Sequence, residues 1–431
     1  MTAVPSYWER GRIKWDTVMV AGATPSTEED GFWLEGDNPS GTPFVSIADM
    51  SRREYVSATA KSLSSDALES RSMPNGQPGT LLFAMYASVG EVAFLNISAT
   101  WNQALLGITP DPDKVDSRFL RYVLLDMRDD LLRDVRSNTQ SNLNARQVGD
   151  IWFQRPPLPE QRAIADYLDR ETARIDTLIE EQQRLIKMLR ERRKAVVERA
   201  VFSGLASYPT KSNAELWLPP VPSHWRVVQI GFASDTLAGY AFPSDGFSAN
   251  EDHVRLLRGV NVKPGRVNWT DTVYWDMEAA PVPSEFDLET GDLVFGMDRP
   301  FVGGGVRVAA ISDDDLPALL LQRVMRIRSN DKAGRGYMRY VMSTDAFFNY
   351  LYPLFTGVSV PHVSEWQVRK FKMPFPPPTE QKSIAAYLDE QTAKIDTLVD
   401  ETERFIELAH ERRSALITAA VTGQIDVREA A

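Results

Sequence analysis

The sequence contains no cysteine, and this absence excludes disulfide bonds, thiolate metal sites and cysteine nucleophiles. Only four histidines occur, and no two of them have the spacing of metal ligands. No stretch approaches the length of about 18 uninterrupted apolar residues that a membrane-spanning helix needs. The first residues also lack the apolar middle of a signal peptide. We therefore expect a soluble, cytoplasmic protein without a metal centre.

Positive charge is also scarce. The 431 residues include 48 Lys+Arg against 59 Asp+Glu, which gives a formal net charge of −11. Because neutralisation of phosphates by Lys and Arg dominates the affinity of proteins for DNA, such a chain is a weak DNA binder by itself. Hydrophobic residues still make up 43%, which is enough for ordinary packed cores.

One long segment occurs twice in the sequence. The stretch EQRAIADYLDRETARIDTL at 160–178 recurs as EQKSIAAYLDEQTAKIDTL at 380–398, an offset of 220 positions. Upstream of it, Val-Pro-Ser-Tyr-Trp at 4–8 recurs as Val-Pro-Ser-His-Trp at 221–225. The order of segments is therefore globular, helical, globular, helical. This pattern indicates a duplicated unit and not a solenoid, because the repeat has the size of a whole domain.

The two repeated segments are predicted to be long helices. Apolar residues recur in seven-residue rows, which place a seam along one helix face. Neither segment contains glycine before Gly204 and Gly423, where helix ends are expected. The economical way to cover two such seams is to pack the helices against each other, antiparallel, as a coiled coil. The residues expected to form this seam or to dock partners are Tyr167, Leu168, Ile175, Leu178, Leu185, Tyr387, Leu388, Ile395, Leu398 and Phe405. Some of the apolar face, including Tyr167, Ile179, Ile186, Tyr387, Val399 and Ile406, is expected to remain for another protein, and the alternative is that all of it is internal seam. The arginine pairs Arg192-Arg193 and Arg412-Arg413 are expected on solvated faces.

The globular parts show short apolar runs bounded by Gly, Pro, Asn and Asp, which is typical of strands and turns, together with helical stretches. The predicted fold is therefore α+β: two globular domains separated by two long antiparallel helices, with internal pseudo-twofold symmetry. The predicted boundaries are 1–156, 157–204, 205–376 and 377–425, followed by a tail at 426–431.

This layout resembles the specificity (S) subunit of type I restriction-modification systems. The resemblance rests on Pro-Leu-Pro-Glu-Gln at 157–161 and Pro-Pro-Thr-Glu-Gln at 377–381. Each is followed by Ile-Ala-x-Tyr-Leu-Asp, by Thr-Ala-[Arg/Lys]-Ile-Asp-Thr-Leu and later by Glu-Arg-Arg. The resemblance covers essentially the whole chain and is strongest in the helices.

The resemblance implies two target recognition domains, each reading one half of a split double-stranded DNA target. It also implies that the helices set the gap and dock two methyltransferase (M) subunits, which two restriction (R) subunits join. The chain itself would be a non-catalytic subunit that binds no cofactor. S-adenosylmethionine, ATP and Mg would be bound by the partners, and the assembled complex would be an adenine-N6 DNA methyltransferase and ATP-dependent endonuclease.

Candidate DNA-contacting residues are polar side chains on loops, because reading base edges requires Arg, Lys, Asn, Gln or hydroxyl groups that can enter a groove. The polar run at 136–142 is the main candidate in the first domain, although such a run can also be a solvated loop. The stretch at 356–362 corresponds to it in the second domain. The candidates are Arg52, Arg53, Asn138, Gln140, Asn142, Arg146, Arg299, Arg307, Ser359 and His362.

Alternative functions remain. Phe301-Val302-Gly303-Gly304-Gly305 matches a methyltransferase cofactor loop, but the sequence that follows it reads as a strand and not as the helix such a loop opens. No Gly-Lys dipeptide exists, so a phosphate-binding loop of that kind is absent. A specificity subunit of a modification-only system, a self-contained DNA methyltransferase or nuclease, and an adaptor that does not touch DNA are the remaining alternatives.

Overall fold

The computed structural model describes residues 5–29, 31–51, 53–86, 88–137, 142–213, 215–302, 305–331, 334–355 and 361–427. The chain forms two compact units: unit 1 contains residues 1–183 and 404–431, and unit 2 contains residues 184–403. Each unit therefore holds one globular domain together with parts of both long helices, α7 (Leu158–Ser203) and α12 (Pro378–Val421). The boundaries between units fall inside these helices.

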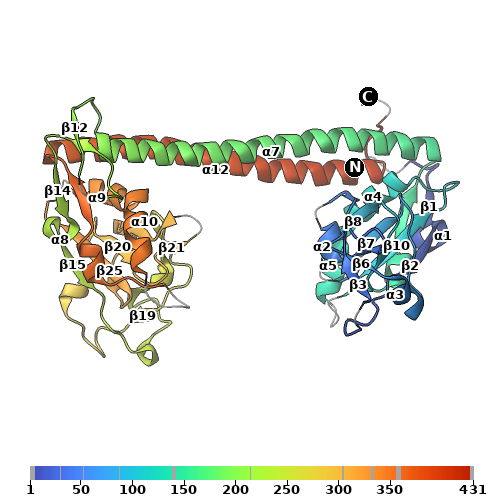
Figure 1. Ribbon diagram of the computed structural model, residues 1–431, viewed down its shortest axis with the longest axis horizontal. Helices are drawn as coiled ribbons and strands as arrows, with labels where there is room; N and C mark the ends of the chain where they lie inside the picture. Colours follow the sequence, from blue (N-terminus) through green and yellow to red (C-terminus); the bar gives the residue numbers. More distant parts are fainter. Residues whose placement is uncertain are drawn as a thin grey trace. The chain divides into compact units, whose positions relative to one another are not determined.

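The globular domain of unit 1 is α+β, as predicted (Figure 1). Its largest sheet has the strand order β2-β10-β7-β8-β5, antiparallel except that β5 runs parallel to β8. A second sheet has the order β3-β6-β4-β9, and β1 pairs with β11. The strands are β1 (Glu9–Arg12), β2 (Thr17–Ala21), β3 (Trp33–Glu35), β4 (Thr42–Val45), β5 (Tyr55–Val56), β6 (Lys61–Leu63), β7 (Leu81–Ala84), β8 (Val92–Leu95), β9 (Thr100–Trp101), β10 (Leu105–Pro110) and β11 (Trp152–Arg155). The shorter helices are α1 (Ile13–Asp16), α2 (Ile47–Met50), α3 (Ser65–Ser70), α4 (Ser117–Asp126), α5 (Arg128–Ser137) and α6 (Ala145–Gly149).

Strand β7 shows why this sheet is buried on both faces. Successive side chains of a strand point to opposite faces. Leu81 and Phe83 belong to a cluster with α4 and the long helices, whereas Leu82 and Ala84 belong to a cluster around Trp101. An uninterrupted apolar run is therefore what this position in the sheet requires.

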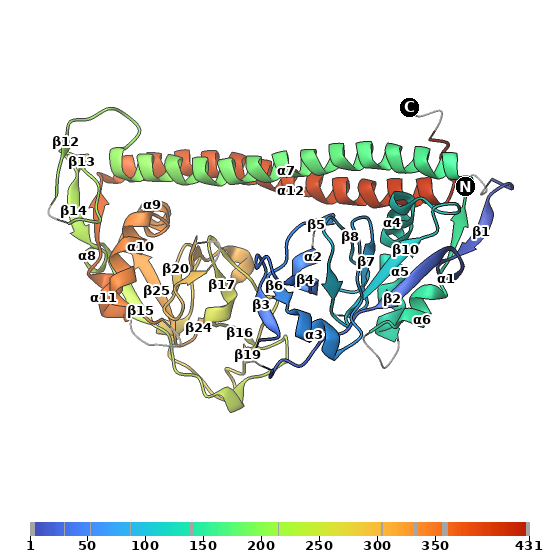
Figure 2. The same cartoon turned by 45° about the vertical axis from the view of Figure 1, so that its right-hand side comes forward.

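The globular domain of unit 2 repeats this plan (Figure 2). Its central sheet has the order β15-β25-β20-β23, a three-stranded sheet has the order β19-β16-β24, and β14 pairs with β26. The strands of these sheets are β14 (Arg226–Gln229), β15 (Ser234–Ala238), β16 (Val254–Leu257), β19 (Tyr274–Trp275), β20 (Leu293–Gly296), β23 (Val308–Ala310), β24 (Ala318–Leu320), β25 (Val324–Ser329) and β26 (Lys372–Phe375). Two-residue strands pair as β12 (Thr210–Lys211) with β13 (Val221–Pro222), β17 (Val262–Lys263) with β18 (Arg266–Val267), and β21 (Phe301–Val302) with β22 (Gly305–Val306). The helices are α8 (Ile230–Ala233), α9 (Gly334–Met342), α10 (Asp345–Leu351) and α11 (Glu365–Arg369), and the 3-10 turns are η1 (Ser244–Gly246), η2 (Gly259–Asn261), η3 (Ser284–Phe286), η4 (Asp313–Asp315) and η5 (Tyr352–Leu354).

The long helices end where the sequence predicts. Gly204 and Gly423 follow α7 and α12 with φ of +75° and +74°, a left-handed conformation that glycine adopts without a Cβ clash. At the other end, the Gln161 side chain donates to the carbonyl of Pro156 at 2.8 Å, and Gln381 donates to Pro376 at 2.8 Å. The prolines before each helix therefore supply a carbonyl that holds its first turn.

Within each unit the two long helices pair antiparallel. In unit 1 the first part of α7 meets the last part of α12, where Arg413 Nε donates to Asp176 Oδ1 at 2.8 Å. In unit 2 the last part of α7 meets the first part of α12, where Arg193 Nε donates to Asp396 Oδ1 at 2.7 Å. These two ion pairs are related by the repeat offset of 220. The expectation of solvated faces is wrong for Arg193 and Arg413, which are half-buried in interhelical ion pairs, whereas Arg192 and Arg412 are exposed as expected.

The seam differs by one position from part of the predicted one. Leu168, Ile175, Leu388 and Ile395 are buried as expected, but Leu178 and Leu185 are 44% and 36% exposed. Their neighbours Ile179 and Ile186, predicted to be free for another protein, are 6% and 8% exposed instead. The seam follows alternating steps of three and four residues, and some of its positions are polar, such as Thr172 and Gln182. Because polar residues interrupt the true seam rows, the neighbouring row that contains Leu178 and Leu185 looks equally apolar in the sequence.

The second helix shows the same displacement. Leu398 and Phe405 are 48% and 44% exposed, and Tyr387 is 38% exposed. Val399 and Ile406, the equivalents of Ile179 and Ile186, are half-buried. Tyr167 on α7 is also half-buried. In the part of the chain that the structure describes, no helix has an apolar stretch long enough to span a bilayer.

Candidate nucleic-acid interface and docking surfaces

The loops that leave β7 and β20 are held in the same way in the two units. In unit 1, Met85 N donates to the Ala104 carbonyl at 2.8 Å, and Leu143 N donates to the Met85 carbonyl at 3.0 Å. In unit 2, Met297 N donates to Arg323 at 2.9 Å, and Val363 N donates to Met297 at 3.0 Å. The residues just before Leu143 and Val363 therefore occupy equivalent positions. They are two of the predicted DNA-contacting residues, Asn142 and His362.

In unit 2 this position is a cluster of charged groups around Asp298. His362 Nδ1 lies 2.6 Å from Asp298 Oδ1, and Arg323 Nε lies 3.9 Å from Asp298 Oδ2. Arg299 is exposed, and its backbone N–H donates to the Pro361 carbonyl at 2.7 Å. His362 and Arg323 thus face one carboxylate, and Arg299 is held beside them by its backbone. Arg323 was not predicted, because nothing in its local sequence distinguishes it.

The two exposed arginines of this cluster share an uncommon backbone conformation. Arg299 has a φ of +45° and Arg323 a φ of +69°. The left-handed region is sparsely populated by residues with a Cβ and is enriched at binding and catalytic sites. Both loops therefore present a long cationic side chain from a strained turn.

Arg307 is buried beneath this cluster and is not one of its exposed cations. It is 8% exposed, and its guanidinium donates to the carbonyls of Val262 at 3.0 Å and Asp298 at 2.8 Å. Burial lowers the pKa of this guanidinium, only partly offset by Asp298. Arg307 thus holds the Asp298 loop in place, and its side chain is too buried to contact DNA directly.

The equivalent surface of unit 1 has different chemistry. Asn142 is exposed, Tyr86 is half-buried, and the exposed Gln103 forms a hydrogen bond with Thr24. Amide and phenol groups replace the charged groups of unit 2. Of the other candidates, Arg53 is exposed, and Arg146 lies on α6 with its side chain 91% exposed and its Nε 4.0 Å from Asp150. Arg52, Asn138, Gln140 and Ser359 lie outside the described residues.

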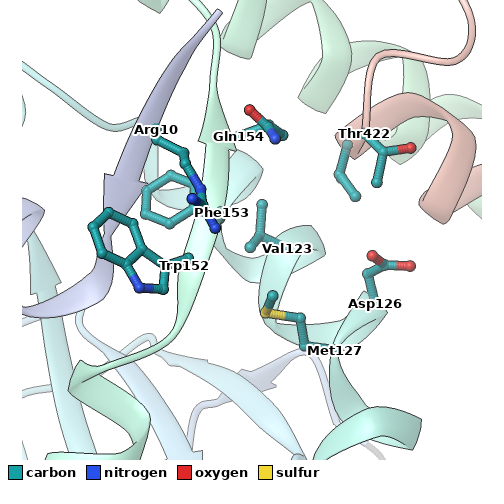
Figure 3. Close-up of a pocket in the computed structure, with 9 residues that line it drawn as sticks. Arg10, Val123, Asp126, Met127, Trp152, Phe153, Gln154 and Thr422 are labelled. Atoms are coloured by element: carbon teal, nitrogen blue, oxygen red, sulfur yellow. The ribbon is translucent and has the colours of Figure 1, made fainter. Parts of the chain in front are cut away.

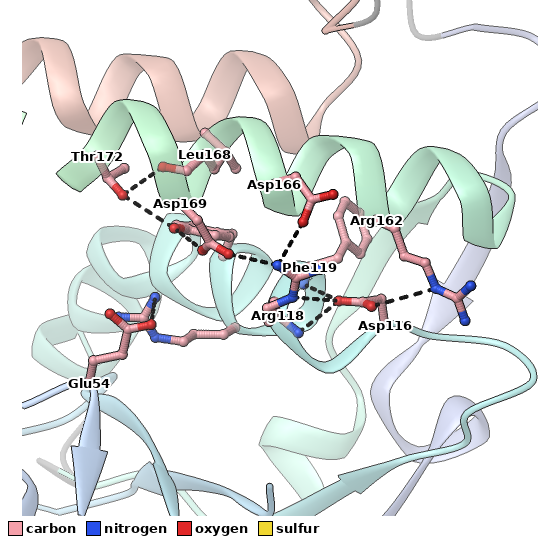
Figure 4. Close-up of polar contacts among 11 residues, drawn as sticks. Glu54, Asp116, Arg118, Phe119, Arg162, Asp166, Leu168, Asp169 and Thr172 are labelled. Atoms are coloured by element: carbon pink, nitrogen blue, oxygen red, sulfur yellow. Dashed lines mark hydrogen bonds and ion pairs between the residues drawn. The ribbon is translucent and has the colours of Figure 1, made fainter. Parts of the chain in front are cut away.

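A repeated hydrogen-bond network fixes each globular domain to a long helix. In unit 1 the hydroxyl of Tyr122 on α4 donates to Asp169 Oδ1 at 2.8 Å and lies 3.2 Å from Thr172 Oγ1. Arg118 donates to Asp166 at 2.7 Å and to Asp169 at 2.9 Å (Figure 4). Burial is the main cause that raises the pKa of Tyr122, so it remains a neutral donor.

The same network recurs in unit 2. Tyr340 on α9 donates to Asp389 at 2.6 Å and lies 3.1 Å from Thr392 Oγ1, and Arg339 also binds Asp389. No sequence pattern distinguishes either tyrosine. Both carboxylates and both threonines belong to the repeated helix motifs, and this network gives those motif residues a physical role.

A pocket in unit 1 lies between β11, the end of α4 and the end of α12 (Figure 3). Its volume is about 140 Å³, below the roughly 300–1,000 Å³ of small-molecule sites. Asp126 in its wall accepts a hydrogen bond from Thr418. No group of His, Asp or Glu among the described residues has an arrangement that could hold a metal ion. The lining residues are Arg10, Val123, Asp126, Met127, Trp152, Phe153, Gln154, Val421 and Thr422.

The long helices also carry exposed apolar side chains. In unit 1 these are Leu178 on α7 and Phe405 and Leu408 on α12, between 44% and 48% exposed. In unit 2 the equivalents at the 220-residue offset are Leu398, Leu185 and Met188. Each unit thus presents the same three helix positions to solvent with apolar side chains. Exposed apolar side chains are uncommon as contiguous patches on monomeric proteins.

Comparisons with known proteins agree with this architecture. Residues 13–188 match the family model described as type I restriction modification DNA specificity domain. The MjaVIII specificity subunit of Methanocaldococcus jannaschii is 24% identical over 343 residues, which cover 79% of this chain and 78% of that subunit. The EcoAI specificity subunit of Escherichia coli is 31% identical over 183 residues, which cover 40% of this chain and 31% of that subunit.

Solved structures with the same fold cover the chain from end to end. A chain from a study of complex assembly and conformational transition in the type I R-M system has a TM-score of 0.75 at 15% identity, with 99% of this chain and 100% of that chain covered. The HsdS subunit from Thermoanaerobacter tengcongensis has a TM-score of 0.53 at 16% identity, with the same coverage. The resemblance predicted from the sequence is confirmed: residues 13–188 match the specificity-domain family model, and the chain is similar over most of its length to a specificity subunit of a type I restriction enzyme and shares the fold of solved type I chains.

Proposed function

We propose that each unit reads one half of a bipartite double-stranded DNA target through the loops at the ends of β7 and β20. The observation that carries this proposal is the equivalence of Asn142 and His362, which are held by matching backbone hydrogen bonds and surrounded by different side chains. Equivalent positions with different chemistry are what two readers of different half-sites require, because base edges are distinguished by the donors and acceptors that face them.

The charge balance indicates that partners contribute to DNA binding. The net charge of the chain is −11, and the Asp298 cluster places a carboxylate among its cations. Phosphate contacts supply most of the affinity in protein–DNA complexes. We expect the isolated chain to bind duplex DNA weakly and with little sequence preference, and M subunits to raise both. Tight and specific binding by the isolated chain at physiological salt would contradict this part of the proposal.

The helices are proposed to set the unread gap and to dock two M subunits. The exposed positions Leu178, Leu185 and Met188 on α7 and their equivalents on α12 supply an apolar surface for partner helices. Chemistry would then reside on the partners: adenine methylation with S-adenosylmethionine on M, and cleavage with ATP and Mg on two R subunits. A modification-only system without R would use the same features of this chain.

The central experiment is methylome sequencing of cells that express the chain with its M subunit. Asn142→Ala should relax or change one half of the methylated target, and His362→Ala should change the other half. His410→Ala, an exposed histidine on α12, is the matched control and should leave the target unchanged. An unaltered target in both site variants would refute the assignment of these loops.

The proposed spacing role has its own test. Seven residues inserted after Leu178 and seven after the equivalent Leu398 preserve the seam register in both helices. Such an insertion adds about 10 Å of helix, or roughly three base pairs at 3.4 Å each. The unread gap in the methylated target should lengthen accordingly, and an unchanged gap would show that the helices do not set it.

A further inference from the structure

Each unit exposes large aromatic side chains at an equivalent place on its short helices. Trp15 on α1 and Phe232 on α8 are related by the 217-residue offset of the domain repeat, and they are 53% and 64% exposed. A second exposed aromatic stands nearby in each unit: Trp152 on β11 at 36%, and Trp366 on α11 at 62%. α1 packs against α6, and α8 packs against α11.

Folding does not require this exposure. On the four-residue helix α1, Ile13 is fully buried and Asp16 is 3% exposed, so these two residues anchor the helix. Ile230 anchors α8 in the same way. Trp15 on α1 and Phe232 on α8 could therefore be polar without any cost to the core of either unit. Patches of exposed aromatic side chains are uncommon on a surface without a partner.

Cations lie over these rings. In unit 1 the guanidinium carbons of Arg10 and Arg12 each lie 4.9 Å from the Trp152 ring centre, and Arg12 also lies 5.3 Å from the Trp15 ring. Figure 3 shows Arg10 beside Trp152. In unit 2, Lys370 Nζ lies 3.9 Å from the Trp366 ring centre, and Arg226 lies 5.7 Å from that of Phe232. Both surfaces therefore combine rings with cations, although the individual residues differ.

Both surfaces are positive on a chain that is acidic as a whole. In unit 1 the cations are Arg10, Arg12, Lys14, Arg146 and Arg155. The carboxylates among them are Asp150, bound by Arg12 and Lys14 at 2.7 Å each, and Glu9 and the buried Asp16, both bound by Arg155, so cations outnumber carboxylates. In unit 2 the set comprises Arg226, Arg369, Lys370 and Lys372, with Glu365 3.5 Å from Arg369 and Glu215 bound to Lys372. Charge complementarity calls for an acidic partner surface.

The rings point to a protein and not to duplex DNA. The bases of a duplex are stacked within it, so tryptophans laid against the phosphate backbone would stay hydrated. Protein interfaces instead concentrate their binding energy in Trp, Tyr and Arg side chains that become desolvated together. The pocket beside Arg10 and Trp152 adds a recess at this surface in unit 1.

We propose that the surface around Trp15 and Trp152 in unit 1 and the surface around Phe232 and Trp366 in unit 2 each dock one copy of the same acidic-surfaced protein. This inference rests on the proposed function, under which that protein is the M subunit. It adds a contact on the globular domain to the proposed contact on the long helices. The duplication accounts for the two copies, because each unit repeats the surface.

The test uses the full chain and its M subunit, with subunit stoichiometry measured by native mass spectrometry over a range of M concentrations. Trp15→Ser with Trp152→Ser should leave one M subunit bound as in the wild type and weaken the other at least tenfold. Phe232→Ser with Trp366→Ser should do the same for the other copy, and the fourfold variant should weaken both. Tyr55→Ser and Tyr352→Ser, at positions 49% and 63% exposed, are matched controls that should bind two copies normally.

Thermal melting establishes that each variant is folded before binding is scored. Wild-type binding of both M copies by a folded fourfold variant would overturn the inference and leave the proposed function standing. Unchanged M stoichiometry with reduced DNA affinity of the assembled complex would also overturn it, because the surfaces would then serve DNA. Failure of the wild-type chain to bind M would overturn the proposed function itself and this inference with it.

Discussion

Arg193 donates two hydrogen bonds to Asp396 across the paired helices, from Nε to Oδ1 at 2.7 Å and from Nη2 to Oδ2 at 3.1 Å. Arg413 donates to Asp176 through the same atoms, at 2.8 Å and 3.2 Å. Partly exposed ion pairs add little stability, about 0.2–1 kcal/mol. Their larger effect is on register, because any sliding of one helix past the other separates both partners.

The first prediction concerns this pair. Arg193→Asp should destabilise unit 2, because it places two carboxylates opposite each other, and the swapped double variant Arg193→Asp with Asp396→Arg should recover most of the loss. Urea unfolding at low and high salt measures both effects, and the loss should shrink at high salt as the charges are screened. Equal stability of the single and double variants would show that the pair does not interact.

The second prediction concerns the junction between domain and helix. Tyr122→Phe removes a buried hydroxyl that contacts Asp169 and Thr172. The expected cost is about 0.5–1.5 kcal/mol in the free energy of unfolding, the net contribution of an ordinary hydrogen bond, since Asp169 keeps Arg118 as a donor. Tyr340→Phe should cost a similar amount in unit 2. Tyr167→Phe, which alters a half-buried tyrosine of the same long helix, is the control, and a loss no greater than in this control would remove the junction's structural role.

The third prediction separates the seam from the outer helix surface. Ile179→Ala, at a position 6% exposed, should cost about 2–5 kcal/mol by leaving a cavity. Leu178→Ala changes the neighbouring side chain, which is 44% exposed, and should cost much less. Binding of M should show the reverse order at concentrations where both variants are folded. Equal destabilisation by the two variants would mean that the seam has been assigned to the wrong positions.

The fourth prediction concerns pH. Partial burial alone would raise the pKa of Asp315, but hydrogen bonds from Ser312 and from the Trp269 indole outweigh it and lower this pKa below the ordinary value of 3.8. The unfolded chain then binds a proton more readily than the folded one near this pH. Stability from Asp315 is therefore present above pH 3.8 and lost as the pH falls through the lowered value.

Asp315→Asn should accordingly be less stable than the wild type near neutral pH, and the difference should narrow as the pH falls below about 4. Urea unfolding across that range measures the difference. Asp314→Asn, which removes the adjacent exposed carboxylate, is the matched control. A difference between wild type and Asp315→Asn that stays constant with pH would contradict the predicted linkage.

Much of this architecture follows from local and periodic patterns in the sequence. The duplicated stretches predict the two long helices, and Gly204 and Gly423 predict their ends, because a break in propensity is a local property. The seam was predicted less well. Ile179 and Leu178 are equally apolar, and only the partner helix decides which of them is covered.

The candidate site illustrates a second limit. Arg299 and His362 were predicted as separate loop residues, and their meeting around Asp298 depends on chain segments more than sixty residues apart. Arg307 and Arg299 carry the same side chain, yet backbone carbonyls bury one of them while the other stays exposed. No local pattern in the sequence marks Arg323, although its φ is +69°. Burial of one arginine and exposure of another is a tertiary property that a single sequence does not reveal.

Unit 2 is continuous in sequence, whereas unit 1 is assembled from two segments that lie on either side of it. Ile417, Ala420 and Val421, near the end of α12, are buried in the core of unit 1 together with Ile164 and Leu168. During translation, the core of unit 1 therefore stays incomplete until the whole of unit 2 and the last part of α12 have been synthesised.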